Sequence, residues 1–202
     1  MPWKKIIQRF LAINNTHRQA CGRREKLLSI FMSNVTKDYS TKQEKLIASF
    51  VGASVVSGSG ARPCHPGDVK STKFLIEAKT HTGLSKVKFL SRVWDKIKDE
   101  AMFSRRYPVL VNDDGSQKID HQWCVCPTTI EHTDDVVIVD YNTVKFKEKP
   151  SSFSFNHYEM IDLYRKTLAT NNAEFAYFKV NLGSDVLYLM PLETFKCTMA
   201  DL

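Results

Sequence analysis

The sequence predicts an α/β fold in which a mixed β-sheet is flanked by helices. Three observations predict it. The 202 residues are 43% hydrophobic and 25% charged, which is typical of a globular chain. Apolar residues recur at helical spacing in some segments and at strand spacing in others. Over residues 40–126 these segments follow the order helix, three strands, helix, two strands.

The predicted helices each carry one apolar face. A helix over residues 40–50 begins at a capping box formed by Ser40 with Gln43 or by Thr41 with Glu44. Gly52 ends this helix, because glycine readily adopts the left-handed conformation that closes helices. A long amphipathic helix is predicted over residues 86–106. The other helices are predicted over residues 4–13, 23–35, 157–169 and from about residue 191.

The predicted strands are rich in β-branched and aromatic residues. Residues 65–79 form a hairpin, and its second strand covers residues 74–79. Residues 108–112 form a buried strand that ends in an Asp-Asp-Gly turn. The other strands are predicted over residues 53–56, 122–126, 136–140, 175–182 and 186–190.

Charge and composition divide the chain into three predicted regions. Residues 1–39 are a basic helical arm, with eight Lys/Arg against two acidic residues. Residues 40–127 form the core, and residues 128–202 form an α+β extension packed on it, with 146–152 as a linker. A basic arm on a nearly neutral body favours a polyanionic partner, nucleic acid above all. A solvated helix face that aids solubility is the simpler alternative.

No stretch of the chain approaches the ~18 consecutive apolar residues that a membrane span needs. The N-terminal residues lack the pattern of a secretory signal. We therefore expect a cytoplasmic protein without membrane association.

Five cysteines are an odd number, and they show no disulfide-framework spacing. Cys64, Cys124 and Cys126, with His65 and His121, offer a zinc site as one alternative. Since the chain has no Cys-x-x-Cys pair, reduced core thiols are the favoured interpretation.

One predicted strand presents acidic and basic side chains on the same face. Glu77 and Lys79 alternate with Ile76 and Ala78, so the charged pair faces away from the apolar pair. Asp68 begins the neighbouring strand and can lie opposite Glu77. Two carboxylates at a hairpin supply the oxygen ligands that Mg²⁺ prefers, and such an ion can activate water. Lys79 can hold water or phosphate as a point charge, so the residues predict phosphodiester hydrolysis.

Asp68 followed by Glu77-Ala78-Lys79 resembles the D…(D/E)-x-K signature of the PD-(D/E)XK nuclease superfamily. The sequence context also matches. Along the chain come Glu44 on the preceding helix, a Gly-Ser-Gly loop, Gly-Asp and then apolar-Glu-x-Lys, in that order. This order is similar to that of archaeal-type Holliday junction resolvases and related virus-encoded endonucleases. The resemblance covers roughly residues 40–126 and departs from the superfamily name at Gly67, where the name has proline.

The resemblance implies a restriction-endonuclease-like core, with Asp68 and Glu77 as metal ligands and Lys79 as the catalytic lysine. It also implies that Glu44 completes the metal site. DNA contacts are expected from the basic arm, the glycine-rich loop and the exposed side of the long helix, namely Arg23, Arg24, Ser59, Arg62, Lys86 and Lys88.

The sequence therefore predicts a Mg²⁺-dependent DNA endonuclease, with Mn²⁺ as a substitute ion, that resembles a resolvase and acts on branched DNA. A homodimer is implied, because a junction has two symmetric strands to cut. A virus-encoded protein of this kind would work in the host cytoplasm. One alternative is the same core in restriction or DNA degradation. Another is a non-catalytic nucleic-acid-binding module, against which the intact set of Asp68, Glu77 and Lys79 argues.

Overall fold

The computed structural model describes residues 37–57, 66–80, 86–133, 135–140 and 151–199. The chain divides into two units, Met1–Asp38 and Tyr39–Leu202, and almost all described residues belong to the second. Several predictions lie outside the described residues: the helices over 4–13 and 23–35 with Arg23 and Arg24, the loop residues Ser59 and Arg62, and all but the end of the 146–152 linker.

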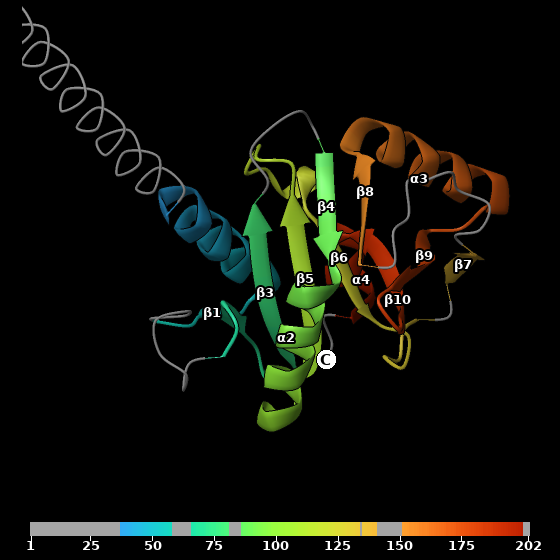
Figure 1. The fold of residues 1–202 in the computed structure, drawn as a ribbon. Coiled ribbons are helices and arrows are strands. Elements are labelled where there is room, and N and C mark those ends of the chain that lie inside the picture. The colour runs from blue at the N-terminus through green and yellow to red at the C-terminus, as the bar shows by residue number, and fades with distance from the viewer. Residues whose placement is uncertain (1–36, 58–65, 81–85, 134, 141–150, 200–202) are drawn as a thin grey trace, which may run out of the picture. The chain divides into compact units, whose positions relative to one another are not determined.

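Among the described residues, eight strands form one mixed sheet and two more form a separate ribbon (Figure 1). The strands of the large sheet are β1 (Ser54–Val55), β2 (Val69–Lys70), β3 (Phe74–Thr80), β5 (Tyr107–Asp113), β6 (Trp123–Pro127), β7 (Val136–Asp140), β9 (Phe175–Leu182) and β10 (Asp185–Pro191). Their order across the sheet is β1-β2-β3-β5-β6-β10-β9-β7. The pairs β3–β5 and β7–β9 are parallel, and the other neighbours are antiparallel. The ribbon pairs β4 (Lys86–Leu90) with β8 (Ser152–Asn156).

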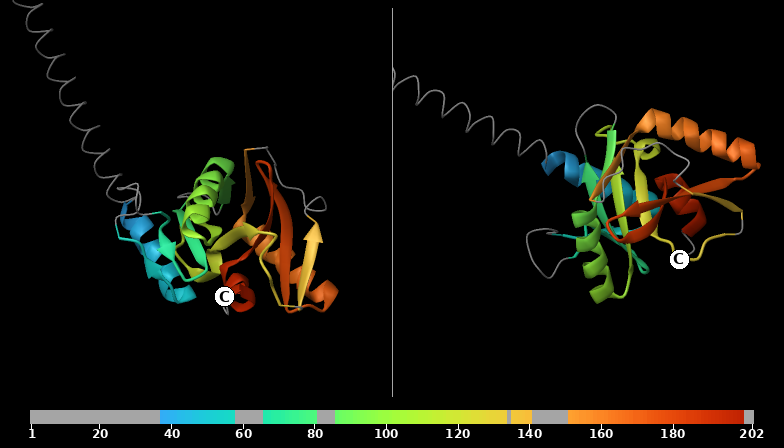
Figure 2. Two further views of the ribbon diagram at one scale, coloured as in Figure 1. Left: turned by 90° about the horizontal axis from the view of Figure 1, so that it is seen from below. Right: turned by 45° about the vertical axis from the view of Figure 1, so that its right-hand side comes forward.

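Helices cover both faces of the large sheet (Figure 2). The described helices are α2 (Ser91–Ser104), α3 (His157–Asn171), α4 (Leu192–Met199), the helical segment 37–51 and the short 3₁₀ turn η1 (Ile119–His121). Leu75 packs in one core cluster with α2 and α3, whereas Ile76 packs in the other cluster with α4 and segment 37–51. The alternation predicted for this strand is therefore confirmed. No helix in the described part of the chain is long and apolar enough to cross a membrane.

The single helix predicted over residues 86–106 is wrong in its first part. Residues before α2 form β4, whose apolar side chains alternate with lysines. Pairing with β8 stacks the rings of Phe89 and Phe153, with centroids 4.9 Å apart, and buries both. A helix would have spread the apolar residues over two faces. Lys86 and Lys88 therefore lie on the exposed face of a strand, not on a helix.

The other predicted helices and strands that fall on described residues are confirmed to within a few residues, whereas β8 is not predicted and begins at Ser152, the last residue of the predicted linker. The first described helix ends at residue 51, and Gly52 follows it with φ +71°. Beyond residue 127 the chain does not leave the sheet, because β10 pairs with β6 and β9 pairs with β10. Strands from the two ends of the described chain thus share one sheet.

Candidate active site

The three residues of the signature meet at the β2–β3 hairpin. Pairing of Val69 with Ile76 sets Asp68 opposite Glu77. Lys79 Nζ lies 2.6 Å from Glu77 Oε1 and 3.8 Å from Asp68 Oδ2. Glu77 is only 2% exposed, and Asp68 is also buried. Two buried carboxylates therefore converge on one ammonium group.

The backbone holds Asp68 in this position. The Ala78 N–H donates to Asp68 Oδ2 at 2.9 Å, and the Asp68 N–H donates to the Ile76 carbonyl at 2.9 Å. The Asp68 carbonyl in turn accepts from the Val56 N–H at 2.9 Å. Main-chain hydrogen bonds to Val56 and Ile76 thus anchor the Asp68 backbone, and the Ala78 N–H orients its carboxylate.

The backbone at position 67 explains why this chain has glycine where the superfamily name has proline. Its φ is +66°, whereas proline is restricted to about −65°. Its N–H donates to Glu100 Oε2 at 2.9 Å, and proline has no such donor. A Cβ at this position would also lie 2.8 Å from the Leu75 side chain. The hairpin geometry therefore requires glycine immediately before Asp68.

Helix α2 adds two charged residues that the sequence did not predict. Lys96 Nζ lies 3.2 and 3.3 Å from the two Glu77 oxygens and 3.7 Å from Glu100 Oε1. Burial opposes the charge of Lys96, but Glu77 outweighs it and raises the lysine pKa. In the sequence, Lys96 and Glu100 form only an i,i+4 pair of the kind common on helix surfaces. Packing of α2 over β3 is what brings them to the site.

The first described helix meets the end of β3 through Gln43, which is fully buried. Gln43 Nε2 donates to the Lys79 carbonyl at 3.3 Å, and Gln43 Oε1 accepts from Thr80 Oγ1 at 2.6 Å. The next residue, Glu44, accepts from Ser40 Oγ at 3.0 Å. Burial and the nearby charge of Asp68 raise the pKa of Glu44. Glu44 is therefore within electrostatic range of Asp68 and Glu77.

The donor set fits a hard divalent cation. Asp68 and Glu77 already hold a positive group between them, and Mg²⁺ commonly takes one or two carboxylates plus water and phosphate. Within the described residues, no group of three or more His, Cys, Asp or Glu side chains is arranged to hold a metal. The predicted role of Glu44 as a third ligand stays a prediction.

Cys124 and Cys126 share a face of β6, as their spacing predicts, and lie in the core cluster under α4. Burial raises the pKa of both thiols well above the ordinary value. Zinc binds the thiolate form, so this environment disfavours the zinc alternative. Cys64 and His65 lie outside the described residues.

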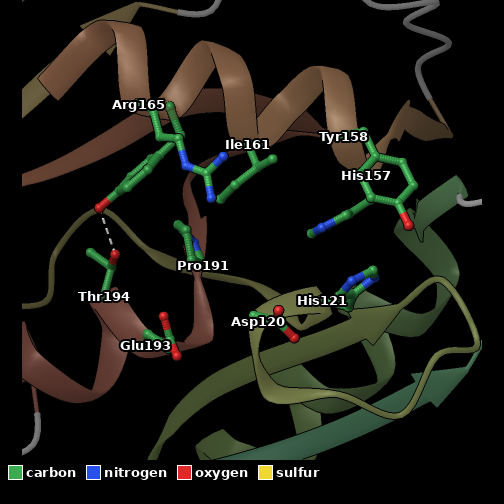
Figure 3. A pocket seen from close by; sticks show the side chains of 10 residues that line it. Asp120, His121, His157, Tyr158, Ile161, Arg165, Pro191, Glu193 and Thr194 are labelled. Atoms are coloured by element: carbon green, nitrogen blue, oxygen red, sulfur yellow. Dashed lines mark hydrogen bonds between the residues drawn. The ribbon is translucent and has the colours of Figure 1, made fainter. Parts of the chain in front are cut away.

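A second polar cluster, which the sequence did not predict as a unit, lies beside a pocket of about 400 Å³ (Figure 3). His121 Nδ1 lies 2.9 Å from Asp114 Oδ2, and its ring stacks on that of His157 with centroids 3.9 Å apart. Trp123 Nε1 donates to His157 Nδ1 at 3.1 Å. These residues come from η1, β6, α3 and the turn after β5, so no local sequence motif predicts the cluster.

Burial and the neighbouring His121 lower the pKa of His157. The hydrogen bond from Trp123 agrees with this direction, because it requires an unprotonated Nδ1. Burial acts to raise the pKa of Asp114, but hydrogen bonds from His121 and Ser116 outweigh it and lower that pKa. His157 is therefore neutral at pH 7 beside an ionised Asp114.

Comparison of the chain with protein-family models, with curated proteins and with solved structures finds no match.

Gly67→Ala should destabilise the protein by about 2–4 kcal/mol, because it adds both a strained φ and a clash with Leu75. Gly52→Ala is the matched control, since Gly52 has a similar φ of +71° but no atom within 4 Å of the added Cβ. The control should lose only about 1 kcal/mol. Urea unfolding measures both, and equal losses would show that the contact with Leu75 is unimportant.

Stability should fall as the pH drops below 6.5, the ordinary pKa of histidine. The pKa of His157 is lower in the folded chain than in the unfolded chain, so the unfolded chain binds a proton at this histidine first as the pH falls. The stability that neutral His157 contributes above pH 6.5 is therefore lost below that pH. His157→Gln keeps an acceptor for Trp123 and should flatten the stability profile between pH 7 and pH 5. A variant whose melting temperature falls as steeply as that of the wild type would contradict this assignment. The contribution of Asp114 is lost separately, below pH 3.8.

Proposed function

We propose that the chain is a metal-dependent DNA endonuclease that hydrolyses phosphodiester bonds on a restriction-endonuclease-like core. The observation that carries the proposal is the convergence of the buried carboxylates of Asp68 and Glu77 on Lys79 Nζ at the β2–β3 hairpin. Burying charged groups costs free energy, and such groups are found most often at functional sites. The parallel pairing of β3 with β5 through α2 supports the proposed core, because it sets the signature strand inside a mixed sheet.

In this proposal Asp68 and Glu77 would hold Mg²⁺, and Glu44 would add negative charge nearby. When bound, the ion supplies Lewis-acid activation of water and stabilises charge on the phosphate. Lys79 provides a positive charge beside both carboxylates, where it can stabilise negative charge that grows at the scissile phosphate. Lys96 approaches Glu77 from α2 and holds that carboxylate in position.

The proposed substrate is branched DNA, and the proposed working form is a homodimer, as the resemblance implies. The net charge of +6 on residues 1–39 supports a polyanionic partner. A cleavage panel of four-way junction, flap, linear duplex and single strand tests the choice of substrate.

A non-catalytic binding module is the second candidate, and one observation favours it. Glu77 already has two lysine partners, Lys79 and Lys96, so its charge is balanced without any metal. The two candidates differ in a simple assay: cleavage that requires Mg²⁺ and stops with EDTA excludes the binding module.

Asp68→Asn and Glu77→Gln should each reduce cleavage in Mg²⁺ by at least about 100-fold while DNA binding changes little. Each variant removes one charged oxygen but keeps the size of the side chain. Asp99→Asn on the exposed side of α2 is the matched control and should cut normally. Thermal melts must show that all three variants fold. Near-normal cleavage by either site variant would overturn the proposed site.

Lys79→Ala should lower the single-turnover cleavage rate by roughly 100-fold at saturating protein. Its ammonium lies beside the carboxylates, where it acts on the transition state more than on binding. Lys70→Ala, on the exposed side of the same hairpin, is the control. If the Lys79 variant cuts normally once saturated, Lys79 only binds DNA.

A further inference from the structure

The pocket beside His157 has the size and composition of a ligand site. Its volume of about 400 Å³ lies within the range of small-molecule pockets. One wall is a stripe of α3 at four-residue spacing, His157, Ile161 and Arg165. Figure 3 shows Asp120 and Pro191 facing this stripe.

His157 points an unused donor into this pocket. The side chain is 96% buried, because only 4% of the residue is exposed. Its Nδ1 accepts from Trp123, so the proton of the neutral ring is on Nε2. A ring nitrogen points into the open space in Figure 3, and the described residues supply no acceptor for Nε2. Since its one lone pair is already used, His157 can donate to a ligand but cannot ligate a metal.

The remaining walls define the chemistry of that ligand. Asp120 and Glu193 offer carboxylate acceptors, and the ring of Tyr158 is exposed at the pocket. Arg165 Nη1 lies 3.9 Å from Asp162 Oδ1 in an exposed ion pair, and the Arg165 side chain is 72% exposed, so its guanidinium can still reach a phosphate at the rim. A nucleobase matches this set, with a flat face for Tyr158, acceptors for His157 and amino groups for the carboxylates. A phosphate matches Arg165.

The pocket lies on the same edge of the sheet as the proposed active site. One cross-strand row joins Lys79 to Asn112, Asn112 to Trp123, and Trp123 to Pro191, which lines the pocket. Adjacent strands are about 4.8 Å apart, so Trp123 is two strand spacings from Lys79. In Figure 1, β3, β5 and β8 all end at the upper edge, where α3 begins.

We propose that this pocket binds one unpaired nucleotide of the DNA strand, with the base against Tyr158 and His157 and the phosphate on Arg165. The inference rests on the proposed function and names the feature of the substrate that is recognised. A base that is already unpaired costs least to place in a pocket. The pocket therefore selects DNA with unpaired bases near the cleaved bond.

The test measures binding in EDTA, so it does not depend on metal or on cleavage. The probes are a short single-stranded oligonucleotide, the same strand with one abasic position, deoxyadenosine monophosphate and inorganic phosphate. Tyr158→Ala and Arg165→Ala should each weaken binding of the mononucleotide by about tenfold. Lys166→Ala, an exposed cation on the same helix outside the pocket, should bind like the wild type.

In the wild-type chain, the Nε2–H signal of His157 in the imidazole NMR spectrum should shift when the mononucleotide is added. This readout needs no variant that has to fold. The abasic strand should bind more weakly than the intact strand.

Three results would overturn the proposal: equal binding of inorganic phosphate and mononucleotide, equal binding of the two pocket variants and the Lys166 variant, or no shift at His157. Binding of the mononucleotide without any effect of the abasic position would overturn the assignment to a strand in favour of a free nucleotide. Because cleavage is not measured, failure here is distinguishable from failure of the nuclease proposal, which the Asp68 and Glu77 variants test.

Discussion

The contacts of the buried Glu77 carboxylate with two half-exposed lysines are the interactions on which the rest of the site depends. A carboxylate that is 2% exposed needs compensating partners, because burial removes its hydration. Lys79 comes from the same strand, whereas Lys96 comes from α2. The site is therefore complete only when α2 packs on β3. Through Glu100, the same helix also holds the backbone of Gly67 before Asp68.

A buried polar network continues from the Lys79 backbone along the carboxyl ends of the parallel strands β3 and β5. Gln43 donates to Gln122 at 3.0 Å, and Gln122 donates to Asp113 at 3.0 Å. Asp113 also accepts from the N–H groups of Gly115 and Gln117 in the turn after β5. Burial raises the pKa of Asp113, while these hydrogen bonds oppose the shift. Since a satisfied network favours one arrangement, the turn that leads to η1 and the pocket is set by the same contacts that anchor the end of β3.

The proposed active site and the pocket therefore belong to one edge of one sheet. The hairpin supplies charge for phosphate chemistry, and the pocket supplies a flat face, one fixed donor and acceptors. Most of the pocket lining comes from C-terminal elements, since α3, α4 and the end of β10 line it together with Asp120 and His121 of η1. Residues after 127 are thereby given a role in the proposed function: β10 completes the sheet, and the helices complete the pocket.

The sequence by itself determined most of the elements, the face shared by Glu77 and Lys79, and the glycine that closes the first described helix, because these depend on local periodicity and backbone preference. Only the tertiary structure decided that residues 86–90 form a strand, since the paired residues of β4 and β8 are 62 to 70 positions apart in the sequence. The arrival of Lys96 at Glu77 and the stacking of His121 on His157 were decided in the same way. Such side chains look like ordinary surface or core residues until distant segments pack together, because nothing in local spacing records which elements become neighbours.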